Sequence, residues 1–197
     1  MHPSPAFAWT DEAEMLALVA DTAFCTIFVR GAAVHVPVTV EGRALRFHVS
    51  RANRALPIIN GARALVSCLG PDGYVSPDWY GTADQVPTWN YVAVEGEGPL
   101  RRLSETELIA QIDALGVVHE ARLAPKRPWT RDKMAPGRFD AMLCGIAGFE
   151  MALDTLRGTR KLGQHKSLHE RRGVITGLTA AGRGDLAAIM QAASDAA

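Results

Sequence analysis

Short apolar runs with strand-like alternation dominate the chain, and turn residues separate them. Alternation together with β-branched or aromatic content predicts strands at residues 24–29, 34–40, 44–49, 62–69, 89–100 and 146–153. Gly42 lies in a short turn between the second and third of these strands, which predicts a β-hairpin. Pro37 cannot donate a ladder hydrogen bond, so we expect an edge or a bulge at its position. The Gly-Pro-Asp-Gly sequence at residues 70–73 predicts a turn that ends the fourth strand.

Helical patterns are fewer, and irregular segments separate some of them. The sequence predicts helices at residues 10–20, 50–60, 104–119 and 185–193. Ser50 is the expected N-cap of the second helix, and Glu107, three residues after Ser104, gives the third a capping box. Residues 74–87 and 124–137 are expected to form loops. Several strands with a hairpin and few crossover helices predict a mainly β protein of the α+β class, a β-barrel with attached helices.

Length and composition are those of a folded globular domain. The 197 residues, with 48% hydrophobic and 21% charged residues, predict one well-buried domain at residues 1–157 and a C-terminal segment at residues 158–197. Lys and Arg number 21, as do Asp and Glu, so the formal net charge is zero. A nucleic-acid-binding domain usually has a basic excess, and the balance therefore disfavours direct DNA binding.

The chain carries no apolar run of the roughly 20 residues that a membrane-spanning helix needs, and its first residues do not resemble a signal peptide. We therefore expect a cytoplasmic protein without a membrane segment. Cys25, Cys68 and Cys144 each have apolar neighbours and lack metal-site spacing, which predicts buried, reduced thiols. His165 and His169 are four residues apart but have no third ligand nearby, so no metal site is predicted.

Polar residues follow the predicted hairpin in an arrangement that suits a phosphate. His35 and His48 lie on its adjacent strands, and either each is a half-buried histidine with its own partner or both border a ligand groove. Ser50, Asn53 and Arg54 come directly after, where the strand is expected to pass into a helix. A helix N-terminus and an arginine would together suit a phosphate monoester, although the same residues also occur in ordinary helix capping.

An aromatic cluster follows in residues 74–91, which hold two tryptophans and all three tyrosines of a chain that is only 7% aromatic. Clustered aromatic side chains with polar tips make large, stiff surfaces that can flank a planar ring. The same cluster could instead form a small hydrophobic core or a dimer interface. These interpretations are compatible, because ligand sites often form between subunits.

Residues 74–80 (Tyr-Val-Ser-Pro-Asp-Trp-Tyr) and 86–91 (Val-Pro-Thr-Trp-Asn-Tyr) closely resemble the signature of the PaiB-like family, the FMN-binding negative transcriptional regulators. Further matching pieces follow in family order at residues 24–26, 34–37, 47–53, 161–164 and 173–178. The resemblance implies an FMN-binding split β-barrel related to flavin reductases and pyridoxamine-phosphate oxidases. It also implies a homodimer with two flavin sites at its interface, with residues 158–197 packing on the barrel or on the dimer partner.

By analogy with those oxidases, the resemblance implies that the hairpin and the segment after it hold the phosphate and ring edge of the flavin. The residues concerned are His35, Pro37, His48, Val49, Ser50, Asn53 and Arg54. Trp89 and Asn90 are then expected near the isoalloxazine ring, and Lys161 and Gln164 are expected to reach in from the C-terminal part.

The sequence departs from the family pattern at three places. Phe47 stands where the family usually has Gly, and Glu95 stands where it usually has His. Residues 163–165 read Gly-Gln-His where the family usually has Ser-Gln-Asn. A bulky ring near the groove, an acid in place of a base and a lost hydroxyl are each expected to weaken the flavin site.

Three functions follow as hypotheses. The first is an FMN-binding protein of the PaiB-like transcriptional regulator type. The alternative is a flavin-dependent reductase or oxidase of a small molecule, without direct DNA binding, in which the cofactor performs the redox step. The third is an interaction module whose flavin site has degenerated. The sequence identifies no catalytic acid or base.

Overall fold

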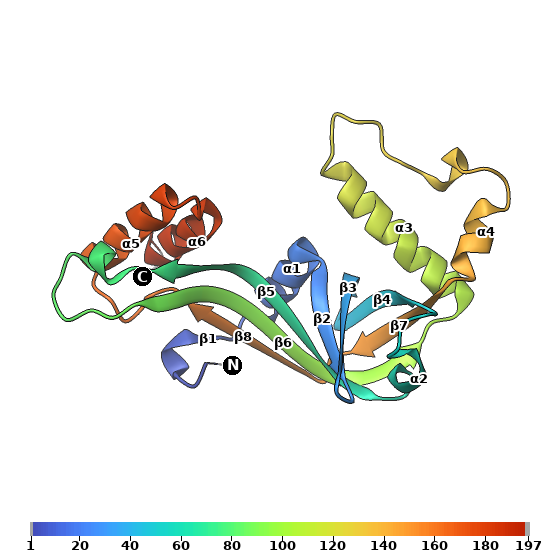
Figure 1. The fold of residues 1–197 in the computed structure, drawn as a ribbon, viewed down its shortest axis with the longest axis horizontal. Coiled ribbons are helices and arrows are strands. Elements are labelled where there is room, and N and C mark those ends of the chain that lie inside the picture. Colours follow the sequence, from blue (N-terminus) through green and yellow to red (C-terminus); the bar gives the residue numbers. More distant parts are fainter. Residues whose placement is uncertain (1, 196–197) are drawn as a thin grey trace. The chain divides into compact units, whose positions relative to one another are not determined.

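The computed structural model describes residues 2–195, which form two compact units (Figure 1). One unit, here called the barrel unit, consists of residues 16–68 and 96–156. The other, the terminal unit, consists of the described residues up to 15, residues 69–95 and the residues from 157 onward. The predicted division into residues 1–157 and 158–197 stays a prediction.

Antiparallel strands make up most of the barrel unit. Its complete strands are β2 (Phe24–Val29), β3 (Ala32–Glu41), β4 (Ala44–Ser50) and β7 (Ile146–Ala152). Parts of β5 (Arg63–Val75) and β6 (Thr88–Arg102) complete it, in the order β5-β2-β3-β4-β7, with β6 also pairing with β7. The predicted hairpin is confirmed, with Val38 opposite Phe47.

The core of the barrel unit follows from the alternation along its strands. Val34, Val36 and Val38 on β3 are buried, and Phe47 on β4 lies opposite Phe149 on β7 with the ring centroids 5.9 Å apart. Both phenylalanines are fully buried, so each removes a large apolar surface from water. The strands therefore hold their register through one packed face, while the opposite face is left for other contacts.

Pro37 is the last residue of β3 that pairs with β2, and the pairing with β4 begins at the next residue. A residue without a backbone N–H fits this change of partner, because it has no ladder bond to lose. Strand β3 therefore pairs with β2 up to Pro37 and with β4 from Val38 onward.

Helices of the barrel unit lie mainly between β6 and β7. They are α3 (Glu105–Ala121) and α4 (Arg138–Leu143), with a 3₁₀ turn at Arg131–Lys133, and a short α2 (Leu56–Ile59) follows β4. The predicted capping box of α3 is confirmed: the Ser104 side chain accepts from Glu107 N, and the Glu107 carboxylate accepts from Ser104 N. The helix packs on β7 beside Gly148, where a Cβ would lie 3.0 Å from the side chains of both Leu103 and Leu108.

The terminal unit holds the remaining strands of the sheet and further helices. Its strands are β1 (Ala8–Trp9), β8 (Thr155–Lys161) and the remaining parts of β6 and β5, in the order β1-β8-β6-β5. Its helices are α5 (Leu168–Ala180) and α6 (Gly184–Asp195), with 3₁₀ turns at Pro5–Phe7 and Pro77–Tyr80. Helix α1 (Glu12–Thr22) begins in this unit and continues into the barrel unit.

Trp79, from the aromatic signature, packs against α5. A Cβ on Gly177 would lie 2.3 Å from its indole ring, and one on Gly173 would lie 2.1 Å from its carbonyl oxygen. Both glycines are therefore required by the close approach of the 3₁₀ turn to the helix.

Two predicted elements are wrong. The helix predicted at residues 50–60 is a turn followed only by α2, because Pro57 lacks the N–H that a helix from Ser50 would need and its ring would clash with the Asn53 carbonyl. The turn predicted at residues 70–73 is part of the extended strand β5. There Gly73 packs against α6, and a Cβ would lie 3.2 Å from Leu186 Cδ2.

Other differences concern elements and residues that the sequence pattern did not indicate. Strand β8 and helices α4 and α5 were not predicted. Cys25 and Cys68 are buried free thiols as expected, whereas Cys144 is exposed, because it ends the short helix α4 at the surface. Within the described part of the chain, none of the helices combines the length and apolar content needed to cross a bilayer.

Candidate functional site

The face of the β3–β4 hairpin that points away from the core carries the predicted residues His35, Pro37, His48 and Ser50. Their sequence neighbours are buried, and successive side chains of a strand point to opposite faces. Val49 is 4% exposed and belongs to the core face, so only its backbone is available to a ligand on this face. The Phe47 ring, expected near the groove, also lies in the core, because Phe47 alternates with His48.

His48 is held by a side chain that the sequence did not point to. Its Nδ1 lies 2.9 Å from Oε1 of Gln111, on α3, and Gln111 is only 2% exposed. With the amide oriented this way, His48 Nδ1 donates, which leaves its Nε2 as an acceptor. Nε2 of Gln111 is buried and has no hydrogen-bond partner among the described residues. The pair therefore combines an acceptor with an unsatisfied donor.

The hydrogen-bond partner of His35 is a different residue from that of His48. Its Nδ1 lies 3.0 Å from Thr26 Oγ1, which is directly opposite on β2. Phe24 and Phe28, on the same face of β2, are 60% and 45% exposed. Strand β2 thus adds two exposed aromatic rings on either side of the Thr26–His35 pair.

The turn after β4 is organised by two of the predicted phosphate residues. Asn53 N donates to Ser50 O, and Asn53 Oδ1 accepts from Ala55 N, both at 2.9 Å. Ser50 Oγ accepts from Ala52 N at 3.2 Å. The polar side chains of Ser50 and Asn53 are therefore used within the turn, while Arg54 is exposed.

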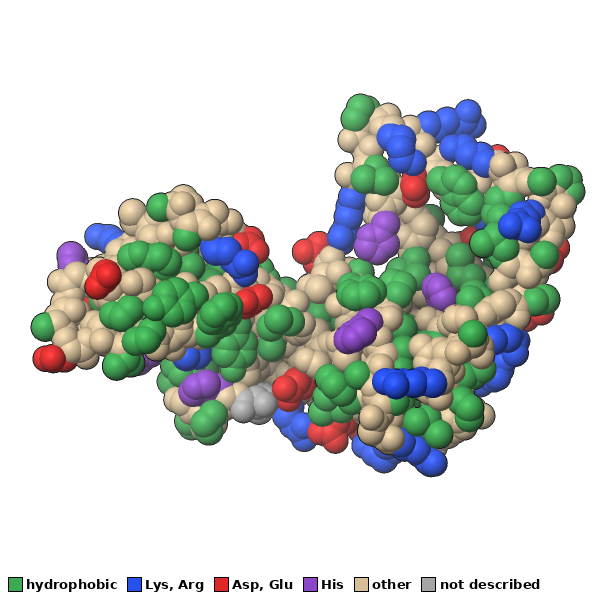
Figure 2. Space-filling view, viewed as in Figure 1, with side chains coloured by type: hydrophobic (Ala, Val, Ile, Leu, Met, Phe, Trp, Pro, Cys, Tyr) green, Lys and Arg blue, Asp and Glu red, His purple; other side chains and the backbone are tan. Residues whose placement is uncertain are grey.

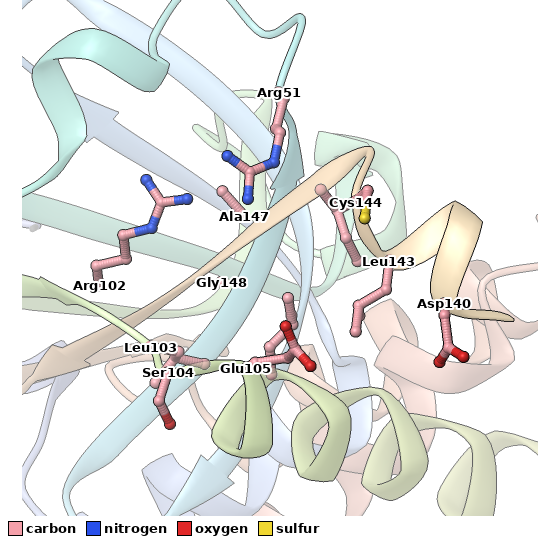
Figure 3. Close-up of a pocket in the computed structure, with 12 residues that line it drawn as sticks. Arg51, Arg102, Leu103, Ser104, Glu105, Asp140, Leu143, Cys144, Ala147 and Gly148 are labelled. Atoms are coloured by element: carbon pink, nitrogen blue, oxygen red, sulfur yellow. The ribbon is translucent and has the colours of Figure 1, made fainter.

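A cavity of about 270 Å³ lies beside this turn, lined by Arg51 of the turn and by residues of β6, β7, α3 and α4 (Figure 3). Arg51 and Arg102 form its basic side, and their guanidinium groups point toward one another in Figure 3. Glu105 and Asp140 lie on the other side. Within residues 2–195, the side chains of Arg51, Arg54 and Arg102 form no ion pair.

Sequence reasoning missed Arg102 and Gln111 because only tertiary structure brings them near the hairpin and the turn that follows it. Arg102 comes to the cavity beside the turn through the pairing of β6 with β7, in which Arg102 is opposite Phe149. Gln111 was one polar residue in an ordinary helical pattern. Arg51 lay inside the matching run at residues 47–53, but no role was assigned to it.

The other predicted residues, Trp89, Asn90, Lys161 and Gln164, belong to the terminal unit. Trp89 is 51% exposed, and its Nε1 donates to Asp72 Oδ1 at 2.8 Å. Asn90 is 2% exposed and donates from Nδ2 to the Met190 sulfur at 3.4 Å.

Lys161 and Gln164 stand at the end of β8. Lys161 Nζ donates to Thr88 Oγ1 at 2.6 Å, and burial lowers the pKa of this lysine. Gln164 folds back on its own turn, where its Oε1 accepts from Leu162 N at 2.9 Å. Gly163 between them has a φ of +75°, so the glycine that replaces the family's serine suits this turn.

The structure therefore divides the predicted site residues into two groups, one in each unit. Apart from Val49, whose side chain lies on the core face, the group in the barrel unit shares one sheet face and the adjoining turn. In the terminal unit, Asn90 and Lys161 line one cavity, whereas Gln164 serves its own turn and Trp89 binds Asp72. Glu95 is half-buried on β6.

Comparisons with known proteins agree with the resemblance. Residues 1–155 match the family described as "Putative FMN-binding domain". The protease synthase and sporulation protein PAI 2 of Bacillus subtilis is 32% identical over 111 residues, covering 56% of this chain and 52% of that protein. An uncharacterized protein of Emericella nidulans is 28% identical over 117 residues, covering 53% of this chain and 47% of its own. The chain thus spans about half the length of these curated relatives.

Among solved structures, the FAD and heme binding protein from Mycobacterium smegmatis has a TM-score of 0.58 and 19% identity, covering 84% of this chain and 78% of that one. The flavocytochrome Anf3 from Azotobacter vinelandii has a TM-score of 0.55 and 15% identity, covering 81% of this chain and 72% of that one. At such identities the likeness concerns the fold alone, and it confirms the predicted α+β split barrel.

Proposed function

Because the chain belongs to the FMN-binding domain family, FMN is its cofactor, and we propose that FMN binds on the outer face of the β3–β4 hairpin. In this proposal the phosphate lies at the turn after β4 and the ring lies along the hairpin. FMN supplies hydride or electron transfer when bound. The protein's own residues hold the phosphate, orient the ring and limit the access of water.

The observation that carries the proposal is the unpaired charge at the turn. Arg51 and Arg102 point toward one another beside the cavity (Figure 3), and Arg54, three residues after Arg51, is exposed. A guanidinium group binds a phosphate dianion through short, charge-assisted and often bidentate hydrogen bonds. Three arginines without carboxylate partners in the described structure therefore fit a phosphate monoester better than any neutral group.

The His48–Gln111 pair fits a flavin ring edge. A flavin offers both carbonyl acceptors and an N–H donor, and this pair offers one unsatisfied donor and one acceptor. A buried donor without a partner is costly, so a ligand that satisfies it gains affinity. These two residues would therefore orient the ring, and the arginines would hold its phosphate end.

A second copy of the chain completes the proposed site. Phe24 and Phe28 leave two large aromatic rings exposed beside His35, and exposed apolar surface next to a candidate site favours an interface. Trp89 and Tyr74, whose ring centroids are 6.3 Å apart and whose side chains are both about half exposed, form a second such surface. A homodimer would cover these rings and exclude water from the flavin.

For the biological role, we favour a flavin-dependent regulator, since the relative from Bacillus subtilis is named for protease synthesis and sporulation. The barrel unit also carries Lys and Arg side chains on and beside the exposed segment between α3 and α4, visible in Figure 2. The second candidate is a flavin-dependent reductase or oxidase. It is favoured by the net charge of zero and by ion pairs that already occupy Lys126 and Arg131 of that segment.

Fluorescence titration tests the proposal directly. Saturable quenching of FMN fluorescence, with a flavin absorption spectrum in the complex, is the expected result. Absence of binding at tens of micromolar FMN would contradict it. Once FMN is bound, anaerobic bleaching by NADH or NADPH would identify the enzyme, whereas a salt-dependent mobility shift of promoter DNA without bleaching would identify the regulator.

A further inference from the structure

A second cavity, of about 370 Å³, lies within the terminal unit and is separate from the site proposed for FMN. Its walls come from the 3₁₀ turn at Pro5–Phe7, the start of β6 and the segment that follows β8. Its volume lies in the range of small-molecule sites in proteins. The cavity is thus large enough for a ligand of modest size.

The charged residues that line this cavity are all basic. Lys161, His165 and Lys166 line it, and its described lining contains no Asp or Glu. Both lysines have only neutral partners: Lys161 Nζ donates to Thr88 Oγ1, and Lys166 Nζ donates to Gln85 Oε1, each at 2.6 Å. No carboxylate of the cavity lining therefore compensates their charge, although Glu170, outside the lining, interacts with the charge of Lys166.

Glu170, the carboxylate that interacts with His165 and Lys166, already accepts hydrogen bonds from other groups. Glu170 accepts from Ser167 N at 2.9 Å in the capping box of α5, and it accepts from Thr82 Oγ1 and Gln85 Nε2 at 2.9 and 3.0 Å. These bonds lower the pKa of Glu170, beginning with the backbone bond from Ser167, and hold its charge outside the cavity lining.

Burial and the two lysines disfavour the protonated form of His165. The pKa of His165 is lowered first by burial and then by the charges of Lys166 and Lys161, while Glu170 acts in the opposite direction. Burial also lowers the pKa of Lys161. An anion among these groups would relieve both the repulsion and part of the desolvation cost.

The remaining wall is apolar and aromatic. Phe7 is 6% exposed and its ring meets that of His165 at 5.6 Å, edge to face. The ring of Tyr80 lies 4.8 Å from Lys166 Nζ, and Val86 also lines the cavity. A ligand that fills this space would therefore need an apolar body beside its charged group.

We propose that this cavity binds a small organic anion, a carboxylate or phosphate monoester on an apolar or aromatic body, through Lys161 and Lys166. The ligand is a second molecule beside FMN and acts either as a substrate or as an effector. This assignment gives Lys161 a role different from the flavin contact that the family resemblance implies, so the two are experimentally separable.

Calorimetric titration of the full chain with benzoate, phenyl phosphate and the neutral analogue benzamide tests this proposal. Benzoate or phenyl phosphate, or both, should bind while benzamide binds at least about tenfold more weakly, because only an anion gains charge-assisted hydrogen bonds from the lysines. The tighter of the two anions identifies the ligand class. Equal binding of benzamide, or no binding of either anion, would overturn the proposal.

Two variants locate the site. Lys161→Gln and Lys166→Gln should each weaken anion binding about tenfold or more, while Lys166→Arg retains it and Lys133→Gln, in the barrel unit, leaves it unchanged. In NMR titrations of the wild-type chain, the pKa of His165 should rise when the anion binds. Anion affinity that is unchanged in both glutamine variants would refute the assignment.

A parallel FMN titration separates this proposal from the proposed function. FMN affinity should be unaltered in Lys166→Gln and Lys161→Gln. If both variants lose FMN affinity in step with anion affinity, the cavity belongs to the cofactor and the proposal is wrong. If the wild-type chain binds the anions but not FMN, the proposed flavin function fails while the anion site stands.

Discussion

Gly177 on α5 offers a test of how the aromatic signature is held. Replacement by Ala would place a Cβ 2.3 Å from Cδ2 and 2.6 Å from Cε2 and Cγ of Trp79, closer than side-chain carbons approach one another. The indole is part of the 3₁₀ turn at Pro77–Tyr80, and Gly173 already brings the same turn against the helix. The ring therefore cannot move away without displacing the turn.

The expected cost follows from two opposing contributions. Overpacking a close contact costs about 1–3 kcal/mol, and the severity of this contact points to the upper half of that range. Ala is a better helix former than Gly by about 1 kcal/mol, which offsets part of the cost. We therefore expect Gly177→Ala to lower the free energy of unfolding by about 1–2 kcal/mol.

Gly116 provides the matched control, because it also lies within a helix and a Cβ there would meet nothing within 4 Å. Gly116→Ala should raise the free energy of unfolding by about 0.5–1 kcal/mol. Urea unfolding followed by circular dichroism measures both variants against the wild type. A Gly177→Ala variant that is as stable as Gly116→Ala would refute the close packing of Trp79 on α5.

Three further predictions concern residues of the barrel unit. Gln111→Leu removes the partner of His48, so FMN and riboflavin affinity should fall together, by roughly tenfold or less; a loss confined to FMN would contradict the ring assignment. The bond from Arg101 is the main cause that lowers the pKa of Glu107 from 4.5 to about 2. A lowered carboxylate pKa stabilises the fold above pH 4.5 and loses this effect as the pH falls toward 2, so Arg101→Gln should destabilise the protein at neutral pH but not near pH 2 in denaturant titrations. Cys144 is exposed while the other two cysteines are buried, so a thiol reagent should modify one thiol per native chain and none in Cys144→Ser; rapid reaction of a second thiol would be inconsistent with the structure.

The sequence predicted the strands well where apolar alternation and clear turn residues coincide. Strand β2 was predicted with its observed ends, and the β3–β4 hairpin follows from alternating valines before Gly42 and alternating apolar residues after it. The prediction from sequence failed where one residue overrides a pattern, as Pro57 does in the helix expected at residues 50–60. It also failed at residues 70–73, where small residues serve the packing of α6 rather than a turn.

The candidate site was predictable only in part. His35, His48 and the turn at residues 50–54 are close in sequence, so local pattern and family resemblance both pointed to them. Arg102 comes to the cavity beside the turn through strand pairing, and Gln111 comes to His48 through helix packing, both over long sequence separations for which a single sequence carries no signal. The resemblance also could not reveal that the side chains of Ser50 and Asn53 form hydrogen bonds within the turn, so that in our proposal the arginines bind the phosphate.

The most direct test of the flavin site compares FMN with riboflavin, which differs only by the phosphate, in wild type, Arg51→Gln and Arg102→Gln. Arg127→Gln, an exposed arginine of the segment between α3 and α4, serves as the control. We expect FMN affinity to fall about 10- to 100-fold in each site variant, with riboflavin affinity unchanged and the control equal to wild type. Equal losses for FMN and riboflavin, or undiminished FMN binding in both site variants, would contradict a phosphate site at the turn after β4.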